Sequence, residues 1–231
     1  MGLESKVVIV TGANGGLGSH VTNAFLEAGA RVIGVSLSIT AAEFPYPRFS
    51  AIPATIANLG DAQALAGAVI AQAGRVDALV HLVGGFAGGK TVAETDDATL
   101  DRMLELNLGS TFHLLRAVLP GMRKQGSGRI LAIGSKAAVE PAPMAGAYAA
   151  SKAALVSLIR TVAREERPHG ITANAVLPGT MDTPANRAAM PDADPAKWVQ
   201  PAQVASLLVH LASDAASQIS GAVIPIYGSE A

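Results

Sequence analysis

Tyr148 and Lys152 are the two residues whose types and spacing best suit catalysis. They lie four residues apart near the start of a strongly helical stretch, which places both side chains on one face of a helix. A tyrosine phenol has a pKa near ~10, so it needs a nearby cation to act as a general acid or base at neutral pH. Lys152 can supply that charge and can also hold ribose hydroxyl groups. The same spacing also occurs on ordinary amphipathic helix surfaces, so the pair alone leaves both interpretations open.

Ser135 is a third candidate, because it directly follows the apolar run that ends at Gly134. That position is the carboxyl end of a predicted central strand, which is where open α/β sheets place their ligands. Its hydroxyl group could hold a substrate oxygen beside Tyr148.

A glycine-rich turn at residues 11–18 follows the first apolar run and precedes a helical pattern. Such a turn lets backbone N–H groups approach a pyrophosphate, and the helix N-terminus adds partial positive charge. An ordinary strand–helix turn could contain the same glycines, but its place after the first buried strand favours a dinucleotide site. The residues expected to bind the cofactor there are Gly12, Asn14, Gly15, Gly16, Leu17 and Gly18.

The end of the second apolar run bears on the choice of nucleotide. An acidic residue there would bond the ribose 2′-hydroxyl of NAD, and an arginine would pair with the 2′-phosphate of NADP. The chain has Ser36 at this position, with neither charge beside it. Because no carboxylate repels a 2′-phosphate, we favour NADP(H) over NAD(H).

Short β-branched apolar runs alternate with helical patterns along the whole chain. Continuous apolar runs are typical of strands buried on both faces, and this alternation predicts a parallel sheet covered by helices on both sides. We therefore expect one doubly wound Rossmann domain over residues 1–231, with a seven-stranded sheet. The expected strands are residues 7–10, 31–35, 49–52, 78–83, 129–133, 172–177 and 223–227, and the expected helices are residues 19–28, 61–73, 99–125, 148–167 and 201–213.

Composition excludes several classes of protein. The chain has 231 residues, of which 50% are hydrophobic and 15% charged, so it can bury a core and is neither disordered nor a coiled coil. Its net charge of −1 predicts no nucleic-acid or membrane partner. The absence of cysteine and of a leader suggests a cytoplasmic protein. The five histidines show no ligand spacing, so we expect no metal.

The segment from Gly84 to Thr91 raises a competing possibility, because it matches the P-loop pattern of NTPases after a predicted strand. However, no predicted strand ends in the acid that would hold Mg²⁺. The residues after Thr91 also begin a helix poorly until about Asp97. A P-loop NTPase is therefore the alternative of a different class, and a catalytically silent dinucleotide sensor is a third.

With these motifs in order, the chain resembles the short-chain dehydrogenase/reductase family over essentially its whole length. The family's glycine turn corresponds to Thr11, Gly12, Gly16 and Gly18, and its tyrosine–lysine motif to Tyr148 and Lys152. The resemblance implies a catalytic serine at Ser135 and a supporting asparagine at Asn107. It also implies a homodimer or homotetramer. Further cofactor contacts implied by the resemblance are Gly84, Pro178, Gly179 and Thr183.

Some features are similar to the dihydropteridine reductase branch of the family, notably the glycine-rich loop at residues 84–89 and the run from Asp182 to Trp198. That branch carries an aspartate where this chain has Ser36, and it lacks the serine found here as Ser135. The chain also departs from the family's Asn-Asn-Ala-Gly motif, which reads His81-Leu82-Val83-Gly84 and leaves the sheet-bracing role of that asparagine open.

The expected reaction is hydride transfer between nicotinamide and a carbonyl or pterin-like C=N substrate, with a 3-oxoacyl or ketone reductase as the alternative. Ser135 would orient the reacting oxygen, Tyr148 would donate the proton and Lys152 would lower the tyrosine's pKa. A substrate loop is expected at about residues 181–200. No cluster of Arg and Lys is visible near the pocket segments to suit a carrier-bound acyl group. Candidate substrate contacts are Phe86, Glu140, Met144, Met181 and Trp198.

Overall fold

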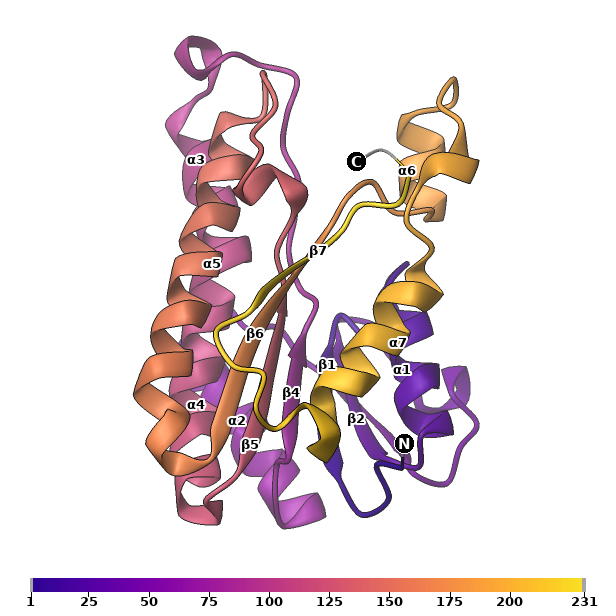
Figure 1. Cartoon of the computed structure of the whole chain (residues 1–231), viewed down its shortest axis with the longest axis vertical. Helices are drawn as coiled ribbons and strands as arrows, with labels where there is room; N and C mark the ends of the chain where they lie inside the picture. The colour runs from indigo at the N-terminus through magenta and orange to yellow at the C-terminus, as the bar shows by residue number, and fades with distance from the viewer. Residues whose placement is uncertain (1, 230–231) are drawn as a thin grey trace.

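A computed structural model describes residues 2–229 and shows one seven-stranded sheet with helices on both faces (Figure 1). All neighbouring strands are parallel, in the order β3-β2-β1-β4-β5-β6-β7, as the buried apolar runs predicted. The strands are β1 (Val7–Thr11), β2 (Arg31–Ser36), β3 (Phe49–Pro53), β4 (Ala78–His81), β5 (Gly128–Ile133), β6 (Ile171–Pro178) and β7 (Val223–Ile226).

Two helical layers cover the sheet. Helices α2, α4 and α5 pack on one face and α1 and α7 on the other, so that the strands lie between them in Figure 1. The helices are α1 (Gly18–Glu27), α2 (Leu59–Ala73), α3 (Asp97–Leu104), α4 (Ser110–Gln125), α5 (Gly146–Glu166), α6 (Pro184–Ala189) and α7 (Pro201–Ala212).

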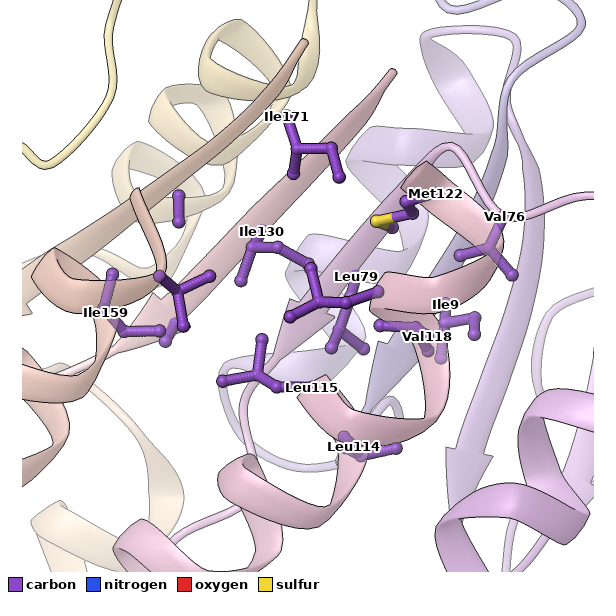
Figure 2. Close-up of a cluster of buried hydrophobic side chains, with 14 of the residues drawn as sticks. Ile9, Val76, Leu79, Leu114, Leu115, Val118, Met122, Ile130, Ile159 and Ile171 are labelled. Carbon is purple, nitrogen blue, oxygen red and sulfur yellow. The ribbon is translucent and has the colours of Figure 1, made fainter. Parts of the chain in front are cut away.

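The core consists of one apolar cluster on each face of the sheet. On the α4 side, Leu115, Val118 and Met122 cluster with Leu79 and Ile130 of the central strands (Figure 2). Because β-branched and leucine side chains project from both faces of β1, β4 and β5, the middle of the sheet is anchored by two cores at once. The carboxyl ends of these strands are therefore a rigid platform.

Most expected elements begin and end within two residues of their expected bounds, and two of the differences bear on the site. The fourth strand ends at His81 rather than at residue 83, because residues 82–88 leave the sheet without ladder bonds. The single helix expected over residues 99–125 is interrupted by a π turn, Glu105–Gly109, between α3 and α4. The π turn makes room for the buried side chain of Asn107, and insertions of this kind are frequent at functional sites.

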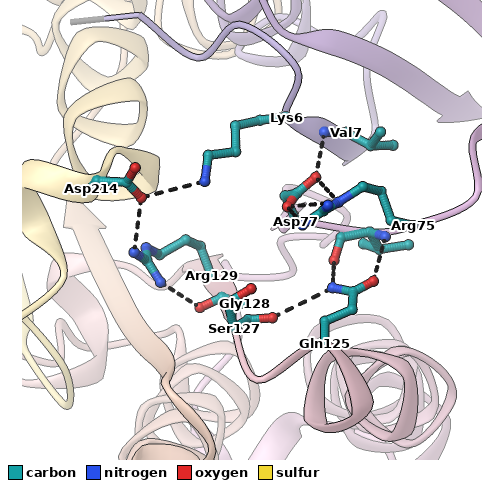
Figure 3. Close-up of polar contacts among 10 residues, drawn as sticks. Lys6, Val7, Arg75, Asp77, Gln125, Ser127, Gly128, Arg129 and Asp214 are labelled. Atoms are coloured by element: carbon teal, nitrogen blue, oxygen red, sulfur yellow. Dashed lines mark hydrogen bonds and ion pairs between the residues drawn. The ribbon is translucent and has the colours of Figure 1, made fainter.

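A network of paired polar groups closes the amino edge of the sheet (Figure 3). The carboxylate of Asp77 accepts hydrogen bonds from the Val7 N–H at 2.8 Å and from two nitrogens of Arg75. Nearby, Lys6 and Arg129 share one carboxylate oxygen of Asp214, each at 3.4 Å. These bonds tie β1, β4 and β5 together where the strands begin.

Candidate active site

The glycine turn after β1 has the shape of a phosphate cradle. Gly12 has a left-handed backbone (φ +67°), and its N–H donates to the Val35 carbonyl of β2 at 2.7 Å. A side chain at Gly18 would collide with the Gly12 carbonyl oxygen, so the turn can close only on glycine there. Gly15 and Gly16 are exposed, and helix α1 starts with no side-chain cap. The N–H groups of Gly12, Gly15 and Ser19 have backbone acceptors, whereas within residues 2–229 none is found for those of Gly16, Leu17 and Gly18. These three N–H groups can therefore meet an anion such as a dinucleotide pyrophosphate.

A cleft of about 270 Å³ continues from Gly12 along the carboxyl ends of β2, β3 and β4. Ser36 lies in this cleft, together with apolar groups that include Ile56, Val83 and Leu106. A cleft with mainly apolar walls beside a phosphate cradle suits an adenine ring, so the geometry fits a dinucleotide. Sequence reasoning missed this wall, because the residues that line the cleft with Ile56, such as Val83 and Leu106, come from distant segments.

Ser135, Tyr148 and Lys152 come together at the carboxyl end of β5. The hydroxyl groups of Ser135 and Tyr148 are hydrogen-bonded, and the Nζ of Lys152 donates to the Ile133 carbonyl at 2.8 Å. Lys152 is only 5% exposed, and burial lowers its pKa to about 8. Burial raises the pKa of Tyr148, with the Ser135 hydrogen bond acting in the opposite direction. The phenol is therefore protonated at neutral pH and able to donate a proton.

Asn107 lies in the π turn and clamps the loop after β4. Its Oδ1 accepts from the Gly85 N–H at 2.9 Å, while its Nδ2 donates to the Gly85 carbonyl at 3.0 Å and to the Ser151 hydroxyl at 2.9 Å. A side chain on Gly84 would lie 2.6 Å from Asn107 Oδ1 and 3.1 Å from Lys152 Nζ. Asn107, Gly84 and Lys152 thus lie close together.

The turn after β6 brings a second cofactor segment to the glycine turn. A Cβ on Gly16 would lie 3.1 Å from the side chain of Thr183, so these two segments are in contact. Thr183 also caps α6, with its hydroxyl oxygen accepting from the Asn186 N–H at 3.3 Å. Pro178 ends β6, and Gly179 is packed against the backbone of Tyr227.

The candidate substrate residues separate into two groups. Phe86 is 67% exposed and its ring stands edge-on to that of Tyr148, with centroids 5.0 Å apart. Met144 is also exposed, and Glu140 pairs with Lys136 at 3.5 Å. By contrast, Met181 is half-buried and forms a bridge with Val199.

Trp198 does not present its ring to a substrate, because it is only 4% exposed. It anchors the end of the loop of residues 181–200 instead. The segment after β7 packs on the backbone at this point: Gly228 lies against the main chain of Trp198, and the Ser229 N–H donates to the Lys197 carbonyl at 3.2 Å. Trp198 is therefore a packing residue in this structure and does not cover the substrate with its ring.

The fold places two cationic side chains that are separated in the sequence beside Phe86. Lys90 and Arg102 line a pocket of about 380 Å³ with Phe86 and Met144. Lys90 pairs with Asp96 at 3.4 Å, whereas no ion pair involving Arg102 is found among residues 2–229. A positively charged rim therefore exists where the sequence showed no basic cluster.

The same segment does not have P-loop geometry. Thr91 caps a single 3₁₀ turn, Val92–Glu94, by donating its hydroxyl to Glu94 at 2.7 Å, and a true helix begins only at Asp97. A P-loop needs a helix that begins directly after the lysine, and within residues 2–229 no α-helix begins directly after Lys90.

His81 is a buried residue to which sequence reasoning gave no role. Its ring bonds Thr11 and Ser110 at the carboxyl end of β4. The only signal was that a histidine stands where the resembling family has asparagine. Across residues 2–229, no group of three or more potential metal ligands is close enough to hold an ion. Within the same range, no helix is long and apolar enough to cross a membrane.

The combination of a parallel sheet, a glycine turn and a serine–tyrosine–lysine group defines a class of nucleotide-dependent oxidoreductases. The sequence profile of the short chain dehydrogenases matches residues 6–194. The chain therefore belongs to the short-chain dehydrogenase/reductase family and is an oxidoreductase.

Relatives match the chain over almost all of its length. The short-chain dehydrogenase/reductase cdmF of Talaromyces verruculosus is 31% identical, covering 97% of this chain and 96% of its own. The 3-oxoacyl-[acyl-carrier-protein] reductase FabG of Salmonella typhimurium is 32% identical, covering 99% and 98%. Among solved structures, gox2181 superposes with a TM-score of 0.91 at 33% identity, covering 98% and 95%. The RhlG/NADP active-site complex of Pseudomonas aeruginosa gives 0.90 at 29% identity, covering 98% and 96%.

Proposed function

We propose that this protein is an NADP(H)-dependent carbonyl reductase in which Ser135, Tyr148 and Lys152 carry out the proton transfer. The observation that carries the proposal is the hydrogen bond between the Ser135 and Tyr148 hydroxyls, with the buried Lys152 one helical turn further along α5. All three lie at the carboxyl end of β5, next to the loop after β4 that leads to Phe86. This is where parallel sheets place their ligands.

The residues divide the proton chemistry among them. Ser135 holds the carbonyl oxygen of the substrate, and Tyr148 donates its proton to that oxygen in the reducing direction. The charge of Lys152 stabilises the phenolate that remains, while its ammonium group holds ribose hydroxyls. Asn107 fixes the loop at Gly85 and, through Ser151, the start of α5. The bound nicotinamide supplies the hydride.

The preference for NADP(H) rests on Ser36. It lies in the cleft beside Gly12, and no carboxylate follows β2 to repel a 2′-phosphate. The similarity to RhlG, which was solved with NADP, supports the same choice. Substitution of Ser36 by Asp is expected to weaken NADPH binding by roughly tenfold or more while leaving NADH binding unchanged or tighter, because the new carboxylate repels a 2′-phosphate but can accept a hydrogen bond from a ribose 2′-hydroxyl. Equal weakening of both cofactors would contradict this assignment.

A 3-oxoacyl group is the substrate class that a specific observation favours. The pocket beside Phe86 has a basic rim from Lys90 and Arg102, and an acidic carrier or an anionic acyl group would meet those charges. Similarity to FabG reductases points the same way. A pterin-like substrate remains the second candidate, and with Trp198 packed away it would have to stack on the exposed ring of Phe86.

We also propose that the protein pairs with itself through α4 and α5. Leu106 and Phe112 are exposed large apolar side chains of the π turn and α4, and the outer face of α5 carries a hollow of about 380 Å³ lined by Val156 and Arg160. Such a face suits a homodimer or homotetramer. Light scattering coupled to size-exclusion chromatography tests it: Phe112→Glu should lower the oligomeric mass, and a monomeric wild-type protein would contradict the proposal.

Calorimetric titration with NADPH, NADH and Mg·ATP in parallel tests the proposed function. The expected result is binding of NADPH, weaker binding of NADH and no heat with Mg·ATP. NADPH oxidation is then followed at saturating cofactor with acetoacetyl-CoA, dihydropterin and simple ketones. Binding of ATP alone, abolished by Lys90→Ala, would overturn the proposal in favour of an NTPase. Binding of NADPH without turnover of any carbonyl would favour a silent dinucleotide sensor.

A further inference from the structure

His81 is a buried imidazole in the middle of the sheet. It is the last residue of β4 and only 2% exposed. Its Nδ1 lies 2.8 Å from the Thr11 hydroxyl oxygen at the end of β1, and its Nε2 lies 3.1 Å from the Ser110 hydroxyl oxygen at the start of α4. One ring therefore connects the strand that enters the cofactor turn with the helix that follows the π turn.

The neighbouring hydrogen bonds determine which ring nitrogen carries the proton. The Ser110 hydroxyl donates its single hydrogen to the Leu106 carbonyl at 2.7 Å, so toward His81 it can only accept. His81 Nε2 is therefore the protonated nitrogen. On the other side, the Thr11 oxygen accepts from the Leu82 N–H at 3.2 Å and donates its own hydrogen to the bare Nδ1. Every donor and acceptor in this set is satisfied by the neutral imidazole.

The hydrogen-bonded chain continues beyond Ser110 to the catalytic helix. Leu106 precedes Asn107 in the π turn, and Asn107 donates to the Ser151 hydroxyl. Ser151 in turn donates to the Tyr148 carbonyl at 2.7 Å. A continuous path thus leads from Thr11, which adjoins Gly12 of the glycine turn, to the backbone of Tyr148.

We infer that His81 is a positioning residue: its neutral ring holds the cofactor turn at Thr11 in register with the π turn that carries Asn107, and through Asn107 with Tyr148. The inference rests on the proposed function, since it concerns the alignment of cofactor and proton donor. An aliphatic residue could fill the same space but could not bond both hydroxyls. The two bonds therefore set the distance between the cofactor turn at Thr11 and the start of α4 at Ser110.

The electrostatic environment is consistent with the neutral ring. Burial and then the nearby charge of Lys152 lower the pKa of His81 to about 3. A second cation at this position would repel the Lys152 ammonium that the proposed reaction needs. An imidazole that stays neutral provides two hydrogen bonds without adding that charge.

The test is a double-mutant cycle on the two hydroxyl groups that meet only through His81. Thr11→Val and Ser110→Ala are made singly and together, first with His81 present and then in a His81→Phe background. For each variant, the NADPH dissociation constant is measured by calorimetry, and kcat and KM are measured at a temperature where circular dichroism shows the protein folded. Thr11→Ser, which keeps the hydroxyl, is the conservative variant. His113→Phe, a half-buried histidine of α4 whose Nδ1 has no hydrogen-bond partner among the described residues, is the matched control.

The expected result is that each single substitution lowers kcat by about five- to twentyfold, and that the double variant is no worse than the poorer single one. The coupling between Thr11→Val and Ser110→Ala in kcat should be at least about threefold when His81 is present. In the His81→Phe background the coupling should disappear. Thr11→Ser should restore kcat, and His113→Phe should leave it within about twofold.

Two outcomes would overturn the inference. Additive effects of Thr11→Val and Ser110→Ala with His81 present would show that the ring couples nothing. A loss of thermal stability with unchanged kcat and unchanged NADPH affinity in the folded variants would reduce His81 to a packing residue. Failure of the proposed function looks different, because the wild-type protein would then reduce no carbonyl; the cycle can still be read from the NADPH dissociation constants.

Discussion

The two edges of the sheet use charged and polar residues in opposite ways. At the amino edge, charges meet opposite charges: Asp77 with Arg75, and Asp214 with Lys6 and Arg129 (Figure 3). At the carboxyl edge, the buried Lys152 has no carboxylate partner within residues 2–229 and donates only to a backbone carbonyl. In the glycine turn beside it, no hydrogen-bond acceptor is found within residues 2–229 for the N–H groups of Gly16, Leu17 and Gly18.

This difference separates polar groups that maintain the fold from polar groups held ready for a ligand. At the amino edge, the carboxylates of Asp77 and Asp214 already have cationic partners, so they have little left to offer a ligand. A buried lysine without a counter-ion weakens the fold and attracts negative charge. Substitutions at the two edges should therefore change different measured quantities.

The largest effect is expected from Tyr148→Phe. Removing the phenol hydroxyl removes the proton donor, so kcat should fall by roughly 10²- to 10⁴-fold while the NADPH dissociation constant changes by less than about threefold. NADPH oxidation and calorimetry measure the two quantities. Tyr46→Phe, made on the other face of the sheet, is the control and should retain full activity. A Tyr148→Phe variant with near-normal kcat would remove the proposed acid from the mechanism.

Lys152→Met should abolish activity and at the same time stabilise the fold. The folded pKa of Lys152 is about 8 against an ordinary value of 10.5, so the charged form destabilises the folded state at every pH below about 8. We expect the free energy of unfolding to rise by about 1–3 kcal/mol at pH 7. This gain should disappear as the pH rises from about 8 to about 10.5, where the folded lysine is already neutral. Urea unfolding at pH 7 and pH 10 measures it, and a destabilised variant at pH 7 would contradict it.

The neutral His81 should make stability depend on acid pH. Its folded pKa of about 3 lies below the ordinary 6.5, so its contribution is fully present above pH 6.5 and decreases as the pH falls toward 3. At pH 5, which is 1.5 units below 6.5, the loss should be about 2 kcal/mol. The difference in unfolding free energy between wild type and His81→Phe should shrink by that amount from pH 7 to pH 5. His81→Asn also lacks a titrating ring and must show the same trend. Unfolding free energies of wild type and variants that fall in parallel between pH 7 and pH 5 would exclude a buried neutral imidazole at His81.

At the amino edge, Asp77→Asn should lower stability without changing chemistry. The substitution replaces the charged acceptor of the Val7 N–H and of Arg75, which should cost about 1–2 kcal/mol in urea unfolding. The values of kcat and KM at 25 °C should stay within about twofold of wild type. A large fall in kcat would show that the two edges are coupled.

The smallest effect is expected for Lys6→Met, which removes an exposed ion pair with Asp214. Such pairs contribute between about 0 and 1 kcal/mol, and Arg129 still reaches the same carboxylate. Urea unfolding at low and at high salt measures the change. Compared with Lys152→Met, this variant tests whether the effect of removing a lysine depends on its burial. Equal changes in the free energy of unfolding for the two variants would contradict such a dependence.

Periodicity along the chain was enough to predict the parallel sheet and the order of strands and helices. Strands buried on both faces are continuous apolar runs, and glycines such as Gly74 end helices in a left-handed conformation that other residues avoid. The break in the helix predicted over residues 99–125 could not be predicted this way. A π turn costs little locally and is stabilised here by distant partners of Asn107, namely Gly85 and Ser151.

Candidate site residues were predictable where their spacing is local. Tyr148 and Lys152 share a helix face because they are four residues apart, and Gly12 and Gly18 belong to one turn. The environment of Trp198 was not predictable, since its burial depends on the segment around Gly228. The basic rim formed by Lys90 and Arg102 likewise arises only when the loop after β4 folds back beside α3.

By itself, the sequence determined the class of fold, the glycine turn and the pairing of Tyr148 with Lys152, because each depends on residues near one another along the chain. Only the tertiary structure decided that Lys152 is buried without a counter-ion, that Trp198 is packed away and that His81 joins Thr11 to Ser110. Burial and hydrogen-bond partners depend on segments far apart in the chain, such as Thr11 and His81, which are 70 residues apart. No local pattern encodes such distances, because side-chain packing across the sheet sets them.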